Sequence, residues 1–500
     1  MKKVTKSLCP ECHKVIKAEI FEDSEGKIRI RKTCDIHGVF EDIYWSDAEL
    51  YKKFEKYWYD GSGISEPNTS LNNNCPYNCG ICKDHKTTTI LANIDVTNRC
   101  NQHCPICFAN AASAGYVYEP TIEQIKDMLI GLRNQKPVPC PAVQFAGGEP
   151  TVRENIVEIV QAASDIGFSH IQIATNGIKL AKSVELCKKL RAAGLKTIYL
   201  QFDGLTEKPY IIARGHNALP LKLKAIENCR AAGLASIALV PTVVKGVNDD
   251  QLGDIIRFAA KNNDVVKGIN FQPVSFAGRI DKTERERMRI TIPDVLHLIE
   301  EQTGGEIAAS DFYPVPFILP ISHFVTSEKN EPYAEFSVHP HCGAGTYVYI
   351  ENGKMIPITR FIDVEGLLEF VNELAVGIER KKYTKSFEKL TAIGKLIKGI
   401  SRFVDPDLAP SQVNVRKLFI DVLKDGTNEA TKEFHRNTLF LGIMHFQDMY
   451  NIDLERIQRC GIHYATPDGR IIPFCTYNTL HREEVERKFA QPLKIPVKHK

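Results

Sequence analysis

Short β-branched segments alternate with helical patterns between residues 90 and 272, and this alternation constrains the fold more than any other feature of the sequence. Consecutive strand–helix units are typical of a parallel sheet, because right-handed crossovers return the chain to the same side of the sheet. We expect six strands, at residues 90–96, 142–146, 170–175, 197–202, 236–241 and 268–272. The sequence therefore predicts an α/β fold built on a partial (β/α)6 barrel, whose ligands gather at the carboxyl ends of the strands.

The chain is longer than this barrel requires. Five hundred residues exceed what one core usually holds. We expect a small metal-binding region at 1–89, the barrel at 90–280, and an α+β domain at 281–500 that carries an auxiliary cluster. The last region contains two similar hairpin-like segments, at 342–357 and 460–473.

The composition is that of a soluble globular protein, with 43% hydrophobic and 25% charged residues and a net charge of +3. This balance argues against broad nucleic-acid binding. There is no run of 18 apolar residues, and the first residues lead into Cys9 and Cys12 rather than a signal sequence, so we expect a cytoplasmic protein. Because the cytosol keeps thiols reduced, the fifteen cysteines indicate metal ligation more than disulfides.

Three cysteines follow the first predicted strand, at Cys100, Cys104 and Cys107. A 4Fe–4S cluster normally takes four cysteines, so three of them leave one iron open to another ligand. A zinc ribbon that lacks its fourth ligand is the alternative. The next predicted strand ends in a Gly-Gly-Glu-Pro turn at 147–150, and the two motifs together favour the cluster.

These motifs resemble those of the radical S-adenosylmethionine superfamily, and the likeness covers residues 90–272. The resemblance implies that S-adenosylmethionine chelates the open iron of a 4Fe–4S cluster and is cleaved reductively to a deoxyadenosyl radical. A reductant such as ferredoxin or flavodoxin would supply the electron. The resemblance also implies cofactor contacts at the ends of the second, third and fourth strands, by Gly147, Gly148, Glu149, Asn176 and Asp203.

Two further cysteine groups precede the barrel. Cys75, Cys79 and Cys82 repeat the spacing of the barrel motif but follow no predicted strand, so we favour an auxiliary 4Fe–4S cluster, with a zinc site as the alternative. The other group has the spacing of a mononuclear zinc or rubredoxin-like iron site, and its fourth ligand is either His37 or a distant cysteine. The cysteines of this group are Cys9, Cys12 and Cys34.

Another group is spread over the C-terminal region. Cys342, Cys460 and Cys475 lie at the two hairpin-like segments and resemble the auxiliary-cluster ligands of other radical enzymes. We therefore expect one or two auxiliary 4Fe–4S clusters in the chain.

Residues 380–404 form a basic amphipathic pattern, with eight Lys or Arg and a single acid, Glu388. Apolar side chains at helical spacing usually pack on their own domain. The alternative is a peripheral contact of this helix with anionic lipid headgroups at the inner face of the membrane.

Residues 439–451 and 459–464 resemble the archaeal group that contains the tetraether lipid synthases. The resemblance implies that the enzyme joins the terminal methyl carbons of two isoprenoid chains, with an archaeal glycerol ether lipid as substrate. The same group has also been assigned to the methylation of a dihydropterin precursor.

We expect lipid coupling, because an auxiliary cluster could hold the first carbon radical until a second hydrogen is abstracted. A radical pterin methyltransferase and a non-catalytic iron–sulfur electron carrier are the alternatives. A lipid substrate needs a long apolar groove, whereas a pterin needs a small polar pocket with stacking aromatic rings. Release of deoxyadenosine would separate both enzymes from an electron carrier.

Overall fold

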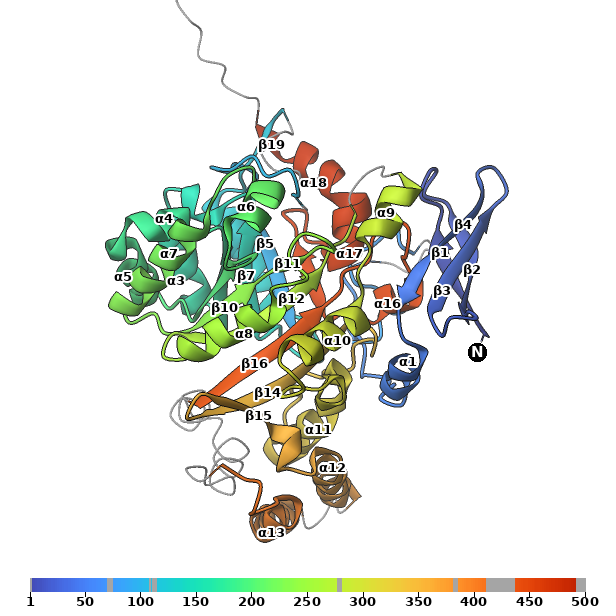
Figure 1. Ribbon diagram of the computed structural model, residues 1–500, viewed down its shortest axis with the longest axis vertical. Coiled ribbons are helices and arrows are strands. Elements are labelled where there is room, and N and C mark those ends of the chain that lie inside the picture. The colour runs from blue at the N-terminus through green and yellow to red at the C-terminus, as the bar shows by residue number, and fades with distance from the viewer. Residues whose placement is uncertain are drawn as a thin grey trace, which may run out of the picture.

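One mixed sheet of thirteen strands organises the computed structural model, which describes residues 2–69, 75–107, 109, 115–276, 281–380, 385–410 and 437–491. Six parallel strands form its centre in the order β12-β10-β9-β8-β7-β5 (Figure 1). Their bounds are β5 (Leu91–Thr97), β7 (Ala142–Gly147), β8 (His170–Thr175), β9 (Thr197–Gln201), β10 (Ile237–Val240) and β12 (Val266–Pro273). The six strands expected from the sequence are confirmed, and most of their residues are buried.

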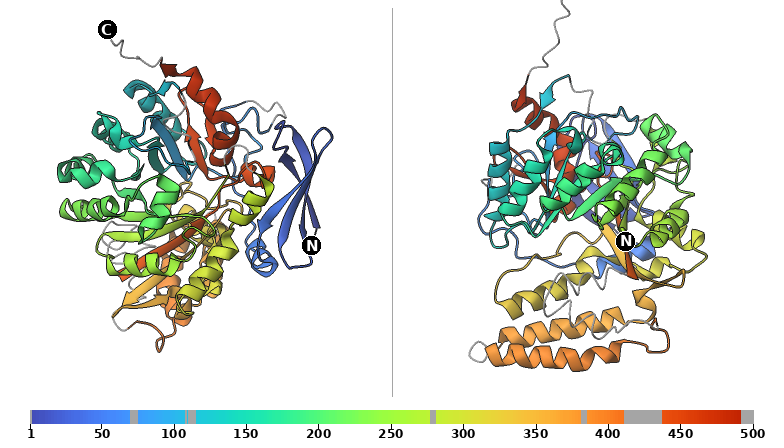
Figure 2. Two further views of the ribbon diagram at one scale, coloured as in Figure 1. Left: turned by 45° about the horizontal axis from the view of Figure 1, so that its top comes forward. Right: turned by 90° about the vertical axis from the view of Figure 1, so that its left-hand side faces the viewer.

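Amphipathic helices follow these strands and cover the outer face of the barrel (Figure 2). α2 (Ile122–Arg133) begins at a capping box between Thr121 and Gln124 and buries Ile125 and Leu129 against the sheet. The other helices around the barrel are α3 (Ile156–Asp165), α4 (Ile178–Lys182), α5 (Val184–Ala192), α6 (Glu207–Arg214), α7 (Leu219–Ala231) and α8 (Leu252–Lys261).

Strands from the C-terminal region extend both edges of the six-strand core. β16 (Thr438–Met444) pairs in parallel with β12, and β17 (Ile462–Ala465) pairs in parallel with β5. The predicted boundary at residue 280 therefore does not separate two sheets. Pairing between strands so far apart in sequence leaves no local pattern, which is why the sequence did not predict it.

The two hairpin-like segments are hairpins in the structure, one at each edge of the sheet. β14 (Gly343–Glu351) pairs with β15 (Lys354–Pro357) and with β16, and β17 pairs with β18 (Ile471–Pro473). Short helices follow or precede them: α16 (Leu454–Gln458), α17 (Phe474–Thr476), η6 (Tyr477–His481) and α18 (Arg482–Lys488). Four short strands complete the pairing: β11 (Thr242–Val243) with β12, β13 (Tyr313–Pro314) with β14, and, as a separate two-stranded sheet, β6 (Val117–Tyr118) with β19 (Ala490–Gln491).

The N-terminal residues form a separate antiparallel sheet at one side of the molecule (Figures 1 and 2). Buried ionic contacts attach it to the rest: Asp42 accepts from Arg285 at 2.8 Å and from Arg289 at 2.7 Å, and Arg289 also pairs with Asp448. The elements are β1 (Lys2–Leu8), β2 (Val15–Glu22), β3 (Ile28–Cys34), β4 (Gly38–Trp45) and α1 (Ala48–Glu55), which contact α9 (Lys282–Met288), α10 (Ile292–Gln302) and the C-terminal region.

A small helical layer lies below the sheet in Figure 1 and has its own apolar core. It consists of α11 (Leu319–Lys329), α12 (Val364–Arg380), α13 (Lys385–Gly399) and η5 (Ile400–Phe403). The basic pattern of residues 380–404 falls here, although residues 381–384 and the side chains of 385–388 lie outside the described residues. Leu396 and Ile400 are buried in this core, whereas Leu390 is 73% exposed. Packing on its own domain is confirmed, and contact with a membrane stays a prediction.

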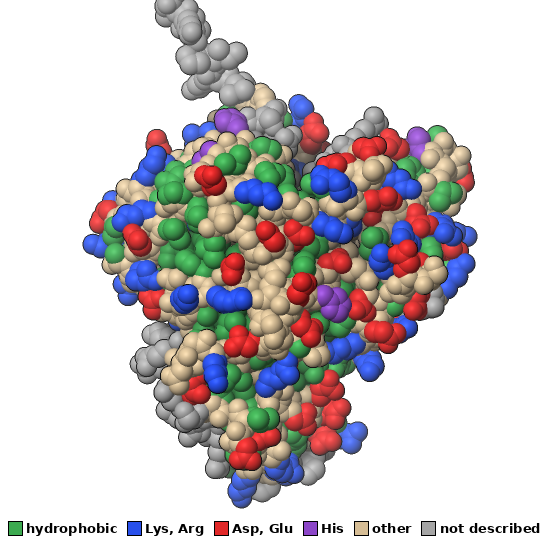
Figure 3. Space-filling model, viewed as in Figure 1, with side chains coloured by type: hydrophobic (Ala, Val, Ile, Leu, Met, Phe, Trp, Pro, Cys, Tyr) green, Lys and Arg blue, Asp and Glu red, His purple; other side chains and the backbone are tan. Residues whose placement is uncertain are grey.

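None of the helices in the described part of the chain combines the length and apolarity needed to cross a membrane. On the face shown in Figure 3, acidic and basic side chains are intermixed.

Candidate active site and metal centres

A cavity of about 600 Å³ lies inside the barrel and reaches from the starts of several strands to the cysteine loop at their carboxyl ends. Its wall includes residues of the six core strands and of both added strands, such as Met444 at the end of β16 and Ile462 at the start of β17. A volume of this size is typical of a site for a cofactor or small molecule. The added strands therefore complete the wall of a single ligand space.

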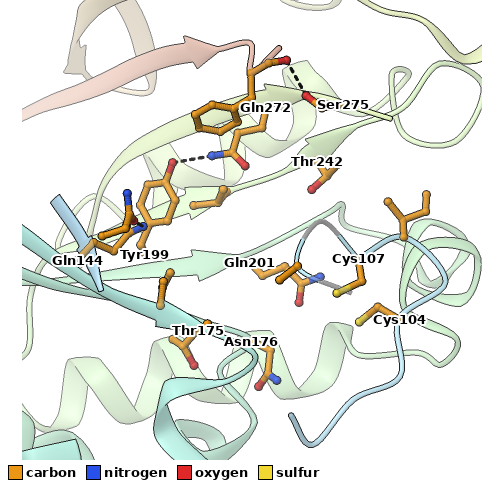
Figure 4. Close-up of a pocket in the computed structure, with 18 of the residues that line it drawn as sticks. Cys104, Cys107, Gln144, Thr175, Asn176, Tyr199, Gln201, Thr242, Gln272 and Ser275 are labelled. Carbon is orange, nitrogen blue, oxygen red and sulfur yellow. Dashed lines mark hydrogen bonds between the residues drawn. The ribbon is translucent and has the colours of Figure 1, made fainter. Parts of the chain in front are cut away.

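Cys100, Cys104 and Cys107 lie on the loop after β5, and all three line this cavity. Figure 4 shows the sulfur atoms of Cys104 and Cys107 close together at the cavity edge. Burial raises the pKa of Cys100 to about 11 and also raises the pKa of Cys104. Such thiols stay protonated at neutral pH unless a metal ion displaces the proton. We propose that they hold the cluster; residues 108 and 110–114, which follow, lie outside the described residues.

The turn after β7 brings the backbone against the start of the cysteine loop. Gly147 has a φ of +124°, and a Cβ there would overlap the carbonyl oxygen of Thr97. A Cβ at Gly148 would overlap the carbonyl oxygen of Arg99, so glycine is required at both positions. Both glycines line the cavity, and we propose that their backbone contacts the cofactor.

Glu149 fastens this turn to the next strand. Its Oε1 accepts from the hydroxyl groups of Thr151, at 2.5 Å, and Thr175, at 2.7 Å, and its Oε2 accepts from the backbone N–H of Asn176 at 2.7 Å. Since each carboxylate oxygen has two lone pairs, Oε2 keeps one for a ligand. Glu149 also lines the cavity, and we propose that it fixes the turn and accepts a hydrogen bond from the cofactor's amino group.

Asn176 links the end of β8 to the cysteine loop. Its side-chain N–H donates to Asn101 at 2.7 Å, and its backbone carbonyl accepts from the Lys222 ammonium at 2.5 Å. Asn176 lines the cavity, so we keep it as a proposed cofactor contact. Burial lowers the pKa of Lys222 to about 8. Lys222 was not predicted, because a lysine in the helical pattern of α7 carries no signal of its own.

Asp203 does not reach the cavity, although a cofactor contact was expected there. Its buried carboxylate accepts two hydrogen bonds from Arg214, both at 2.8 Å, and one from Gln201 at 3.0 Å. Arg214 does line the cavity, and it donates to the carbonyl oxygen of Ile106 in the cysteine loop at 2.8 Å. Arg214 therefore faces the ligand space and Asp203 anchors it, and a direct cofactor contact of Asp203 stays a prediction.

Amide side chains form a continuous row across three strands at the cavity wall. Gln172 donates to Gln144 at 2.7 Å, Gln144 donates to Asn93 at 2.6 Å, and Asn93 donates to the carbonyl oxygen of His463 at 3.4 Å. The three amides are register neighbours on β5, β7 and β8 and all line the cavity. Each amide nitrogen donates one of its two hydrogens within this row, so its other hydrogen can be donated to a ligand.

A phenol faces the same space from β9 (Figure 4). The Tyr199 hydroxyl accepts hydrogen bonds from the side chains of Asn270 and Gln272, the latter at 2.9 Å. Burial raises the pKa of Tyr199 to about 12, so the phenol keeps its proton at neutral pH. Because both neighbours donate to its oxygen, this proton has no acceptor among the described residues.

Aromatic rings line another part of the wall. Phe446 and Phe474 stack with centroids 3.9 Å apart, and Tyr464 lies 5.3 Å from Phe474. Arg482 lies over the Tyr464 ring and pairs with the buried Asp95 at 2.5 Å. Flat apolar faces and a row of amides therefore line the same cavity, a combination that suits a flat heterocycle with polar edges.

The scattered cysteines of the C-terminal region come together beside this aromatic wall. Cys342 precedes β14, Cys460 precedes β17 and Cys475 follows β18. All three cysteines therefore lie at the ends of the two hairpins. Burial, followed by the charges of Cys475 and Cys342, raises the pKa of Cys460. Backbone and side-chain donors point at the sulfurs: the N–H of Gln447 lies 3.3 Å from Cys475 Sγ, and Arg456 Nε lies 3.4 Å from Cys342 Sγ. We propose these three cysteines as ligands of an auxiliary cluster.

Cys75, Cys79 and Cys82 form a neighbouring group. Burial raises the pKa of Cys75 to about 11 and that of Cys79 to about 12, and the charge of Cys82 acts on both. Cys79 Sγ lies 3.7 Å from the hydroxyl of Thr476, which follows Cys475 directly. Grouped, buried thiols again suit metal ligation, and we propose a second auxiliary cluster here, with zinc as the alternative.

The N-terminal sheet brings Cys9, Cys12, Cys34 and His37 to one point. Cys12 and Cys34 have sulfurs 3.9 Å apart, and His37 Nδ1 lies 3.5 Å from Cys9 Sγ and 3.6 Å from Cys34 Sγ. Two sulfurs bound tetrahedrally to zinc at about 2.3 Å lie roughly 3.8 Å apart, so the spacing fits. Hydrogen bonds from the backbone of Ile36 and His37 lower the pKa of Cys34 to about 6, which favours the thiolate. Of the two fourth ligands considered, the structure favours His37.

Two known families match separate parts of the chain. Residues 94–259 match the family described as "Radical SAM superfamily", and residues 1–46 match the "HMPTM N-terminal zinc ribbon domain". The first match covers the loop of Cys100, Cys104 and Cys107 and the glycine turn, and the second covers the N-terminal site. The zinc ribbon match favours zinc over iron at that site.

Individual relatives match over different lengths. The chain is 56% identical over 497 residues to the 7,8-dihydro-6-hydroxymethylpterin dimethyltransferase of Methanocaldococcus jannaschii, covering 99% of this chain and 96% of the relative. It is 27% identical over 231 residues to the GTP 3',8-cyclase of Peptoclostridium acidaminophilum, covering 45% of this chain and 69% of that enzyme. Among solved structures, SuiB of Streptococcus suis aligns with 44% of this chain and 48% of its own, at 17% identity and a TM-score of 0.34.

The full-length relative overturns the expectation of isoprenoid coupling. A protein that matches this chain from end to end carries the name of a pterin dimethyltransferase, so a lipid substrate and carbon–carbon joining of lipid chains were the wrong prediction. The wrong choice arose because the sequence resemblance pointed to a group with two assigned activities, and the cavity that separates them is formed by residues from distant strands.

The cysteine loop, the glycine turn and the full-length similarity lead to one conclusion. This chain is a radical S-adenosylmethionine enzyme, and it belongs to the family of the 7,8-dihydro-6-hydroxymethylpterin dimethyltransferase of Methanocaldococcus jannaschii.

Proposed function

We propose that the enzyme methylates a 7,8-dihydropterin that it binds in the barrel cavity. The observation that carries this proposal is the amide row of Asn93, Gln144 and Gln172, which lines the same cavity as the three cysteines of the barrel loop. Similarity over 96% of a relative named for dihydropterin methylation supports the same substrate class.

A pterin presents a flat ring edged by alternating hydrogen-bond donors and acceptors. Side-chain amides match such an edge, because each offers both a donor and an acceptor in one plane. The stacked rings of Phe446 and Phe474 offer apolar faces on which a flat heterocycle can lie. Buried polar groups left unpaired by a wrong ligand would each cost about 1–3 kcal/mol, so the amide row favours the pterin over an apolar chain.

The Tyr199 proton gives the pocket a directional contact. Since Asn270 and Gln272 hold the phenol oxygen as acceptor, its O–H can donate only to a ligand in the cavity. We assign to it a carbonyl or ring-nitrogen acceptor of the pterin.

When bound, S-adenosylmethionine and the 4Fe–4S cluster would supply a deoxyadenosyl radical that takes a hydrogen atom from a C–H bond of the pterin, and a separate one-carbon donor, such as a second S-adenosylmethionine, would supply the methyl group. The chain positions both reactants around that radical. Glu149 and the two glycines of the β7 turn hold the cofactor side, Arg214 carries positive charge to the cavity, and the amide row orients the pterin. A low-potential ferredoxin or flavodoxin is the proposed electron donor.

The test is anaerobic incubation of the reconstituted enzyme with S-adenosylmethionine, dithionite and 7,8-dihydro-6-hydroxymethylpterin, followed by mass spectrometry of the pterins. We expect methylated pterin together with deoxyadenosine. Absence of methylated pterin, together with deoxyadenosine formation that the pterin does not increase, would contradict the substrate, and the absence of deoxyadenosine with an intact cluster would favour the electron carrier.

A pair of variants ties the result to the pocket. Gln144→Met breaks the centre of the amide row and should raise the pterin KM roughly tenfold or more, as expected for about 1–3 kcal/mol. Thr197→Val is the matched control, because its hydroxyl pairs with Ser236 at 2.9 Å in the same barrel but does not line the cavity. Equal effects of the two variants would argue that the row supports the barrel rather than the substrate.

A further inference from the structure

The guanidinium of Arg456 is buried at the edge of the Cys342, Cys460 and Cys475 group. The residue is 2% exposed and lies in the short helix α16. Its Nε donates to Cys342 Sγ at 3.4 Å, its Nη2 donates to the carbonyl oxygen of His445 at 2.9 Å, and it lies over the ring of Tyr44.

Arg456 differs from the other buried arginines in its lack of a carboxylate partner. Arg289 pairs with Asp42 and Asp448, Arg214 pairs with Asp203, and Arg459 pairs with Asp60. Within the described part of the chain, no carboxylate oxygen lies within 4.0 Å of the Arg456 guanidinium. Burial of an unpaired charge is costly, so another anion must balance it.

Among the groups in direct contact with Arg456, sulfur is left as that anion, since the Asp453 carboxyl group acts on the guanidinium only through space. The nearby Asp453 directs its two carboxylate oxygens to the hydroxyl groups of Thr5, at 2.6 Å, and Tyr44, at 3.1 Å. The imidazoles on which the Arg456 charge acts, His339, His341 and His445, are buried and supply no negative charge. The remaining neighbours are the sulfurs of Cys342 and Cys475, whose charges act on Arg456.

We propose that Arg456 balances the charge of an iron–sulfur cluster bound by Cys342, Cys460 and Cys475 and raises its reduction potential. Hydrogen bonds to cluster sulfurs and nearby positive charge both stabilise the reduced, more negative cluster. Arg456 is thus a positioning residue for this cluster, and the inference does not depend on which substrate occupies the barrel.

The test compares Arg456→Met with Arg456→Lys in the full-length, anaerobically reconstituted protein. Each is titrated potentiometrically and followed by electron paramagnetic resonance, and the signal to follow is the one that Cys460→Ala removes. We expect Arg456→Met to shift the one-electron reduction equilibrium of that cluster at least tenfold toward the oxidised form, about 59 mV downward. Arg456→Lys keeps the charge and should recover most of the shift.

Arg459→Met is the matched control, because Arg459 is also buried beside α16 but pairs with Asp60 rather than a cysteine. The potential should not move in this control. An unchanged potential in Arg456→Met with full iron content, or a full complement of clusters in Cys460→Ala, would overturn the proposal. Arg456→Met could also lose the cluster altogether. In that case, a cluster retained in Arg456→Lys supports charge balance by Arg456. A cluster lost in both Arg456 variants but kept in the control overturns the proposal and indicates that Arg456 acts through packing.

Discussion

Two buried arginines lie beside cysteine groups, and they differ in what balances their charge. Arg214, beside Cys104, forms two hydrogen bonds with the carboxylate of Asp203, so its charge is balanced before any cluster binds. Arg456, beside Cys342, contacts a sulfur and a backbone carbonyl. The first site is therefore built to accept an exchangeable ligand in an open cavity, whereas the second requires a resident anion. The predictions below test this contrast.

The largest difference should appear when one cysteine is removed from each group. Cys104→Ala deprives the cavity cluster of one of three ligands, and deoxyadenosine formation should fall at least about a thousandfold, equivalent to about 4 kcal/mol in barrier. Cys460→Ala should lose iron and sulfide while deoxyadenosine formation falls far less. Chromatography of anaerobic reactions measures both rates. Equal losses would mean that the two groups act as one unit.

Asp203→Asn should be the most damaging change to the balanced arginine. It leaves the Arg214 charge buried beside a neutral amide. Because breaking a buried ion pair in this way typically costs about 3–5 kcal/mol, we expect the unfolding free energy to fall by about 3–5 kcal/mol. Denaturant unfolding of the metal-free protein measures it. Arg456→Met should cost the metal-free protein much less, since it removes a charge that has no carboxylate partner. A larger loss for Arg456→Met would break the comparison.

Tyr199→Phe should have a moderate effect confined to the cavity. Loss of one hydrogen bond of about 0.5–1.5 kcal/mol raises the dihydropterin KM up to about tenfold, while cleavage of S-adenosylmethionine persists. Steady-state kinetics with varied pterin measures this. Tyr210→Phe is the control, because its buried hydroxyl donates to Gly204 at 2.9 Å away from the cavity. No change in KM for Tyr199→Phe would remove the phenol from substrate recognition.

Tyr77→Phe should give the smallest effect. The Tyr77 hydroxyl donates to the carbonyl oxygen of His13 at 2.5 Å and so joins the loop of Cys75, Cys79 and Cys82 to the zinc-ribbon sheet. Its loss should cost about 1 kcal/mol and speed iron release to a chelator from that group severalfold. Tyr333→Phe, at an exposed position, is the control. Unchanged release would mean that this loop holds its metal without help from the N-terminal sheet.

The sequence predicted what is encoded locally. The six core strands are short β-branched segments that alternate with helical patterns, and Cys100, Cys104 and Cys107 stand close together on one loop, so both could be found from the sequence. The amide row left a weaker signal: Asn93, Gln144 and Gln172 each occupy the third position of a strand in the structure. A polar residue recurring at one depth of successive buried strands could have been noticed.

Other features depend on contacts that no local pattern records. Arg214 and Arg456 are single arginines in ordinary helices, and their roles follow from neighbours far along the chain. Asp203 has the position expected of a cofactor contact, but the guanidinium of Arg214 stands between it and the cavity. The pairing of β16 and β17 with opposite edges of the barrel brings distant residues into the cavity wall.

That edge pairing also sets the order of events during synthesis. A nascent chain that has emerged through residue 276 already contains the cysteine loop and all six core strands, but it lacks the wall residues Phe446, Tyr464 and Phe474. Domains fold in the order in which they leave the ribosome. The edge strands β5 and β12 of the incomplete barrel therefore lack their outer partners until residue 475 has emerged. Maturation with iron and sulfide at Cys460 and Cys475 must therefore follow translation of the hairpins. A protein arrested before that point would be a target for chaperones rather than an apoenzyme.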